Sequence, residues 1–73
     1  MIATLKSTTK IVSLNGVPAR IWEGTTASGI KVHAYITRVA VSEDQNQEEF
    51  ARELAACAAP SKEVEAIPMR MII

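Results

Sequence analysis

The chain is poor in the residues that build catalytic and metal sites. Its 73 residues include one cysteine, Cys57, and one histidine, His33. A single cysteine cannot form an intramolecular disulfide, which is typical of proteins from a reducing cytosol. One cysteine and one histidine also cannot complete a closed zinc site, and no glycine-rich phosphate loop is present. We therefore expect no catalytic residue, no metal and no cofactor, and predict that the chain is not an enzyme.

A long apolar segment is also missing. No part of the sequence approaches the roughly 20 consecutive apolar residues that a membrane-spanning helix needs. Lys6 and Lys10 interrupt the N-terminal region, which therefore does not resemble a signal peptide. We predict no membrane association and a cytoplasmic location.

Aromatic residues are scarce, whereas small and aliphatic residues are abundant. Trp22, Tyr35 and Phe50 are the only aromatic residues, although 48% of the chain is hydrophobic. The core must therefore be built from Ile, Val, Leu, Met and Ala. The length predicts one domain, residues 1–73, with residues 1–9 loosely ordered. Such short chains often gain stability by forming oligomers.

The net charge of zero hides an uneven distribution. Residues 1–42 carry five lysines and arginines against a single acid, Glu23, whereas residues 43–73 carry seven acids and three basic residues. Acids can gather near the start of a helix because the helix dipole favours them there. The alternative is a basic sheet face and an acidic helix edge that suit a charged partner.

A tight hairpin is the clearest local signal. Asn15-Gly16 separates two apolar segments, residues 11–14 and 17–22. This dipeptide tolerates the positive φ angles of a two-residue type I′ turn. The turn predicts that Val12 faces Ala19 and that Leu14 faces Val17.

A second turn, over residues 24–29, predicts a third strand from Ile30 to Val41. The pairing that brings all aliphatic residues to one face aligns Ile21 with Val32, Ala19 with Ala34, and Val17 with Ile36. The apolar positions change phase after Arg38, which predicts a bulge or sharp twist near residues 37–40.

A helix and a short strand complete the predicted fold. Asn46 with Glu49, or Asp44 with Gln47, can cap the helix, and Glu48 with Arg52 forms an i, i+4 pair. Pro60 ends the helix, and residues 61–66 form a connector with at most one further turn. The apolar stripe that would cover the sheet comprises Phe50, Leu54, Cys57 and Ala58. Residues 69–73 alternate like a strand. The fold class is α+β: a three-stranded antiparallel meander, one helix packed on one face, and a short C-terminal strand (β-β-β-α-β).

The predicted register gathers a cationic, aromatic surface on the sheet face away from the helix. It comprises Arg20, Trp22, Lys31, His33 and Tyr35, with Arg38 at the rim. Three interpretations stay open. The side chains can stabilise the sheet alone, bind a protein, because Trp, Tyr and Arg dominate protein hot spots, or bind nucleic acid or a nucleotide by stacking and phosphate contact.

The apolar C-terminus, with Met69, Met71, Ile72 and Ile73, has two interpretations. It can form a core strand, or it can form a homodimer through edge pairing or strand exchange.

The chain resembles a group of small proteins carried by tailed bacteriophages and prophages of Proteobacteria. The likeness covers about residues 10–73 and is strongest at Trp22-Glu23-Gly24-Thr25-Thr26, Ile36-Thr37-Arg38-Val39-Ala40 and Ile67-Pro68-Met69-Arg70-Met71-Ile72. The resemblance implies a phage accessory protein that binds and inhibits a host protein or complex, with anti-defence proteins such as anti-CRISPRs as one class. It transfers no site residues. The alternatives are a nucleic-acid or nucleotide-binding module and a virion assembly component that acts through its edge strands.

Overall fold

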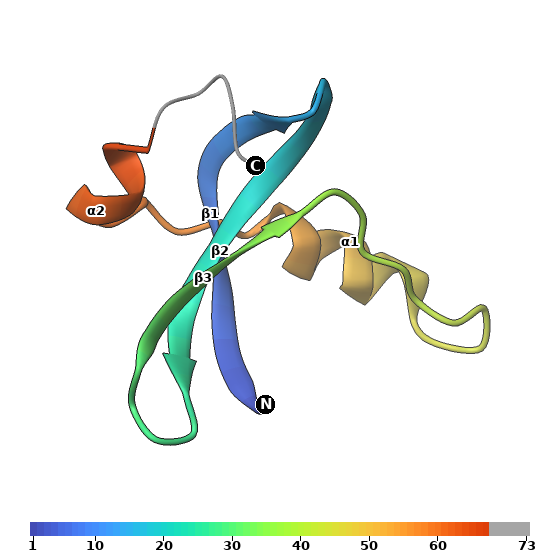
Figure 1. The fold of residues 1–73 in the computed structure, drawn as a ribbon. Helices are drawn as coiled ribbons and strands as arrows, with labels where there is room; N and C mark the ends of the chain where they lie inside the picture. Colours follow the sequence, from blue (N-terminus) through green and yellow to red (C-terminus); the bar gives the residue numbers. More distant parts are fainter. Residues whose placement is uncertain (68–73) are drawn as a thin grey trace.

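The chain forms a three-stranded antiparallel sheet followed by two helices (Figure 1). The computed structural model describes residues 1–67, in the order β1 (Ala3–Leu14), β2 (Val17–Thr26), β3 (Lys31–Ile36), α1 (Gln47–Ala55) and α2 (Lys62–Glu65). The strand order in the sheet is β1-β2-β3. The predicted α+β class, with an antiparallel meander followed by a helix, is therefore confirmed. The predicted strand at residues 69–73 lies outside the described residues.

The first hairpin follows the local sequence signal. Asn15 and Gly16 have φ angles of 52° and 85°, as a type I′ turn requires. Val12 pairs with Ala19 and Leu14 pairs with Val17. The predicted turn and its register are confirmed.

The N-terminal segment is part of the sheet. β1 begins at Ala3, and Ala3 to Ser7 pair with Thr26 to Trp22 on β2. The prediction that residues 1–9 are loosely ordered is therefore wrong. β2 is long enough to offer these residues a partner, and threonines such as Thr4 and Thr25, which lie opposite one another, favour extended backbone once they are paired.

The second hairpin has a different register from the predicted one. Ile21 pairs with Tyr35 and Trp22 with Ala34, so the predicted partner of Ile21, Val32, is three positions away. The loop is shorter than expected because Thr26 closes it. Its backbone N–H donates to the carbonyl oxygen of Ile30 at 2.9 Å, and its hydroxyl accepts from the N–H of Ile30 at 3.1 Å. An odd shift reverses which side chains share a face.

The irregularity of the sheet lies in β1, not after β3. β3 ends at Ile36, and the predicted bulge near residues 37–40 lies outside any strand. Between the pairs Ser7–Trp22 and Ile11–Arg20, residues 8–10 of β1 face only Ile21 of β2. The hydroxyl of Thr8, which is 1% exposed, donates to the carbonyl oxygen of Ile21 at 2.7 Å. This bond compensates for the interrupted ladder, because buried polar groups need partners.

The short helix α2, rather than α1, covers the core. Val64 of α2 is 2% exposed and packs with the core residues of the sheet, which are Val12, Ala19 and Ile21. Tyr35 and Ile67 are half-buried beside them. The Ser61 hydroxyl caps α2 by accepting from the N–H of Val64. The helix α2 corresponds to the further helical turn that the sequence allowed after Pro60.

The helix α1 does not bury an apolar stripe. It contains no buried residue, and Leu54 is 41% exposed. The predicted stripe is wrong because the helix ends at Ala55, so Cys57 and Ala58 lie in extended chain, where Ala58 bridges to Thr8 of β1. Figure 1 shows α1 and α2 on opposite sides of the strands. No helix within residues 1–67 has the length and apolarity to cross a membrane.

The ends of α1 follow the sequence in part. The side chain of Asn46 accepts from the N–H of Glu49 at 2.9 Å, so the predicted cap is confirmed. Arg52 pairs with Glu49 and not with the predicted Glu48.

Candidate functional site

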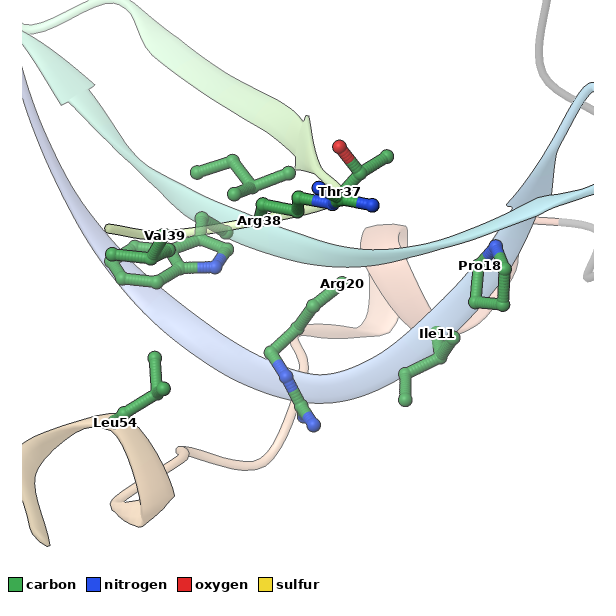
Figure 2. Close-up of a pocket in the computed structure, with 9 residues that line it drawn as sticks. Ile11, Pro18, Arg20, Thr37, Arg38, Val39 and Leu54 are labelled. Atoms are coloured by element: carbon green, nitrogen blue, oxygen red, sulfur yellow. The ribbon is translucent and has the colours of Figure 1, made fainter. Parts of the chain in front are cut away.

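A groove lies on the sheet face opposite the core. We call it the Trp22 groove (Figure 2). It encloses about 280 Å³ between β1, β2, the segment after β3, and α1. It is lined by Ile11, Pro18, Arg20, Trp22, Ile36, Thr37, Arg38, Val39 and Leu54. Strand alternation places Arg20 and Trp22 on this face, because the core residues Ala19 and Ile21 point the other way.

The bulge in β1 positions Arg20. The guanidinium donates from Nη1 to the carbonyl oxygen of Thr8 at 2.7 Å, and the side chain is half-buried. The residues of a bulge leave ladder carbonyls unpaired, and here a cationic donor satisfies one of them. Arg20 is therefore held in the lining of the groove by this bond. Its guanidinium supports the sheet and also adds positive charge to the groove.

Arg38 supplies a second positive charge. It is exposed on the segment that follows β3, and none of the nine lining residues is acidic. Within residues 1–67 the single ion pair joins Arg52 and Glu49 of α1. Neither arginine of the groove is neutralised by an ion pair within residues 1–67, so the groove carries a net positive charge that a partner can contact.

The rest of the lining is apolar and open to solvent. Ile11 is 39% exposed, Val39 is 41% exposed and Leu54 is 41% exposed, whereas Trp22 is half-buried. Leu54 comes from α1, so this helix contributes a side chain to the groove and none to the buried core. Figure 2 shows Leu54 and Val39 on the same side of the groove, apart from Ile11 and Pro18.

The structure divides the predicted binding residues between two faces. Arg20 and Trp22 lie in the groove with Arg38, whereas Lys31, His33 and Tyr35 lie on the core face. The prediction that these six residues share one surface is wrong, because β3 is shifted by an odd number of positions. Arg20 pairs with Ile36 and Trp22 pairs with Ala34, and not with His33 and Lys31.

The three residues on the core face have other contacts. Tyr35 packs against the core, and its hydroxyl lies 3.0 Å from Nε2 of His33, with the two rings edge to face. Lys31 and His33 line a second cavity of about 380 Å³ next to α2, together with Glu23 and Glu63. Glu23 accepts from the backbone N–H of Ser61 at 2.8 Å. This cavity carries charges of both signs, and its carboxylate Glu23 already holds α2 to the sheet.

Sequence reasoning missed the contributions of Ile11, Val39 and Leu54 to the groove. The sequence did contain a signal for Val39, because the alternation of apolar residues shifts by one position after Arg38. Leu54 had one as well, because it belongs to the apolar stripe of α1. Ile11 had one too, since the predicted register of the first hairpin, with Val12 opposite Ala19, already pairs Ile11 with Arg20.

The described residues hold no evident metal site. Across residues 1–67, no three His, Cys, Asp or Glu side chains lie close enough together to hold a metal ion. Cys57 is half-buried, and the hydroxyl of Ser7 donates to its sulfur at 3.7 Å.

Comparison with known proteins identifies no relative of the chain. No family model matches the chain, and no curated protein or solved structure is significantly similar to it. The resemblance to phage-encoded proteins stays a prediction.

Proposed function

We propose that the chain is a phage accessory protein that binds a host protein or complex through the Trp22 groove and blocks it. The observation that carries the proposal is the composition of the groove: one tryptophan and two arginines among exposed aliphatic side chains, with no acid in the lining. Tryptophan and arginine are the residues most enriched among the energetically dominant positions of protein interfaces. The resemblance to phage-encoded proteins supports the assignment of the partner to the host, with anti-defence activity as one form of the block.

The physical basis is apolar burial combined with charge. Association would remove the exposed parts of Ile11, Val39 and Leu54 from water, and Trp22 would supply a rigid, flat contact. Arg38 would pair with a carboxylate of the partner and steer the encounter. An enzyme activity has no comparable support.

A protein partner fits the groove better than a nucleic acid does. Stacking platforms for single strands place successive aromatic side chains on one surface. Trp22 and Tyr35 lie on opposite faces of this sheet, and Tyr35 packs on the core. The groove therefore offers one aromatic side chain among exposed aliphatic ones, which favours protein contact.

The experiment compares two single variants that lie on opposite faces. The wild-type chain first captures its partner from a bacterial host lysate, and the affinity for the purified partner is then measured by calorimetry. Trp22→Ala should weaken binding by at least about thirtyfold, which corresponds to about 2 kcal/mol. His33→Ala, an exposed residue on the core face, should bind like the wild type. Circular dichroism checks that both variants keep the fold.

Two results would refute the groove as the binding surface. The first is unchanged affinity of a folded Trp22→Ala variant. The second is an equal loss in both variants, which would indicate a general effect on the fold. Arg38→Glu provides an independent check, because this exposed side chain forms no ion pair within residues 1–67, and the reversal of its charge should also weaken binding.

A further inference from the structure

Arg20 has apolar neighbours on every side of its position in the Trp22 groove. Along β2, strand alternation puts Pro18 and Trp22 on the same face, two positions before and two positions after Arg20. Across the sheet, Arg20 pairs with Ile11 of β1 and Ile36 of β3. All four of these neighbours line the groove. Arg20 therefore brings a positive charge into an otherwise apolar part of the surface.

This charge is not neutralised by a carboxylate within residues 1–67. The guanidinium donates from Nη1 to the carbonyl oxygen of Thr8, which carries no net charge. The one ion pair of the described residues lies on α1, and no acid lines the groove. A guanidinium has five N–H donors, so Arg20 keeps donors for a ligand. An apolar occupant alone would bury this half-exposed charge without a counterion, which is costly. The groove therefore selects an occupant that brings one anionic group to Arg20.

The dimensions of the groove fit a row of side chains. Its volume of about 280 Å³ lies below the range of about 300–1,000 Å³ that is typical of pockets for small molecules. The intervals from Pro18 to Arg20 and from Arg20 to Trp22 are two residues each, or about 6.6 Å along a strand. An extended segment repeats the side chains of one face at the same interval. Side chains at i, i+2 and i+4 of such a segment therefore match these three positions.

We infer that the Trp22 groove binds an extended segment of the partner in which one carboxylate is flanked, two residues away on each side, by large apolar side chains. This inference rests on the proposed function, since the segment belongs to the partner protein. The carboxylate accepts hydrogen bonds from the guanidinium of Arg20, which are among the stronger hydrogen bonds in proteins. The apolar side chains pack on Pro18 at one end and on Trp22 at the other.

A second copy of this chain fits the groove less well. Groove against groove would bury two Arg20 guanidiniums with no carboxylate between them. The acidic helix of the chain is α1, where the exposed Glu53 precedes Leu54, but Leu54 already lines the groove of its own chain. Because Glu53 adjoins a lining residue, a segment with a single central carboxylate suits the groove better than a run of acids does.

The test uses capped pentapeptides and the single tryptophan of the chain, whose indole N–H gives one NMR signal from the groove. The peptide Leu-Ser-Glu-Ser-Leu is titrated into the ¹⁵N-labelled chain and should shift this signal with saturation. The peptide Leu-Ser-Gln-Ser-Leu should bind about tenfold more weakly, the size expected for losing a hydrogen bond to a charged group. The peptide Glu-Ser-Leu-Ser-Leu has the same composition but a terminal acid, and it should also bind more weakly.

Two variants assign the carboxylate to Arg20. In Arg20→Gln, which removes the charge but keeps a side-chain N–H, the glutamate and glutamine peptides should bind equally well. Arg38→Gln is the matched control, because Arg38 is the other arginine of the groove and is exposed. It should keep most of the tenfold preference for glutamate. Circular dichroism checks the fold of both variants. The peptide comparison in the wild-type chain needs no variant, so it decides the inference even if Arg20→Gln does not fold.

Four outcomes overturn the inference. The first is equal affinity of the wild-type chain for the glutamate and glutamine peptides. The second is a preference for glutamate that persists in folded Arg20→Gln. The third is a change of the indole signal on dilution without peptide, which would indicate that a second copy occupies the groove. The fourth is tighter binding of a short oligothymidine than of the glutamate peptide, which would indicate a phosphate ligand.

The proposed function can fail separately. If a host partner is captured through Trp22 but the peptides do not discriminate, only the present inference is wrong. If the peptides discriminate but Trp22→Ala does not change the affinity for the host partner, only the proposed function is wrong.

Discussion

The replacement Val64→Ala, set against Leu54→Ala, tests which helix stabilises the fold. Val64 is 2% exposed and is the only fully buried side chain of α2, whereas Leu54 of α1 is 41% exposed. Leucine is the larger side chain, so composition alone predicts the greater cost for Leu54→Ala. The structure predicts the reverse, because Val64 closes the core over Val12 and Ile21.

The expected magnitudes follow from buried area. Val64→Ala removes two buried methyl groups, worth about 0.8 kcal/mol each. The remaining cavity adds to this cost, while the better helix propensity of alanine offsets a few tenths. The net loss of unfolding free energy is about 2 kcal/mol, which lowers Tm by about 8–16 °C in a domain of this size. Leu54→Ala should cost less than about 1 kcal/mol, because much of its side chain is already in contact with water.

Thermal and guanidinium unfolding followed by circular dichroism measure both variants. Lys62→Ala is the control on α2: its side chain is exposed, and its effect should stay within about 0.5 kcal/mol. The reasoning is refuted if Leu54→Ala destabilises the chain as much as Val64→Ala. That result would mean that α1 packs on the sheet.

Three further replacements test the strands. Gly24→Ala should destabilise the chain by about 1–3 kcal/mol or more, because an added Cβ would overlap the backbone of Thr4 on β1; chemical denaturation measures the loss. Thr8→Val should cost about 1–3 kcal/mol, since it leaves the buried carbonyl of Ile21 without its donor; the same assay applies, with added loss of amide protection near the bulge. Gly16→Ala should cost about 1 kcal/mol, because its φ of 85° disfavours a side chain although space is available; the Tm reports it.

The replacements of Gly24 and Thr8 each have a control. Gly29→Ala has a positive φ and open space, like Gly16, and so separates backbone strain from the steric overlap expected at Gly24. Thr9→Val changes the exposed neighbour of Thr8 and should be nearly neutral. A Gly24→Ala variant as stable as Gly16→Ala would contradict the close approach of β1 and β2 at this point.

Local chemistry made part of the fold predictable. The turn at Asn15-Gly16 and the cap at Asn46 depend on groups within four residues of one another, and the structure confirms the turn and one of the two alternative caps. The short helical turn after Pro60 was also among the structures that the sequence allowed. Of the residues predicted to form one surface, only Arg20, Trp22 and Arg38 lie together, because two of them are on the same strand and the third lies just after the next strand.

The sequence by itself determined the class of the fold and the first hairpin, and it limited the start of the first helix to two alternative caps, since the turn and the caps depend on contacts between near neighbours. Only the tertiary structure decided which residues share a face. The loop at Thr26 set the register of β3 three positions away from the aliphatic match, and an odd shift moves Lys31, His33 and Tyr35 to the side opposite Trp22. The bulge at Thr8 and the covering of the core by Val64 also arise from contacts between distant segments, which no local pattern encodes.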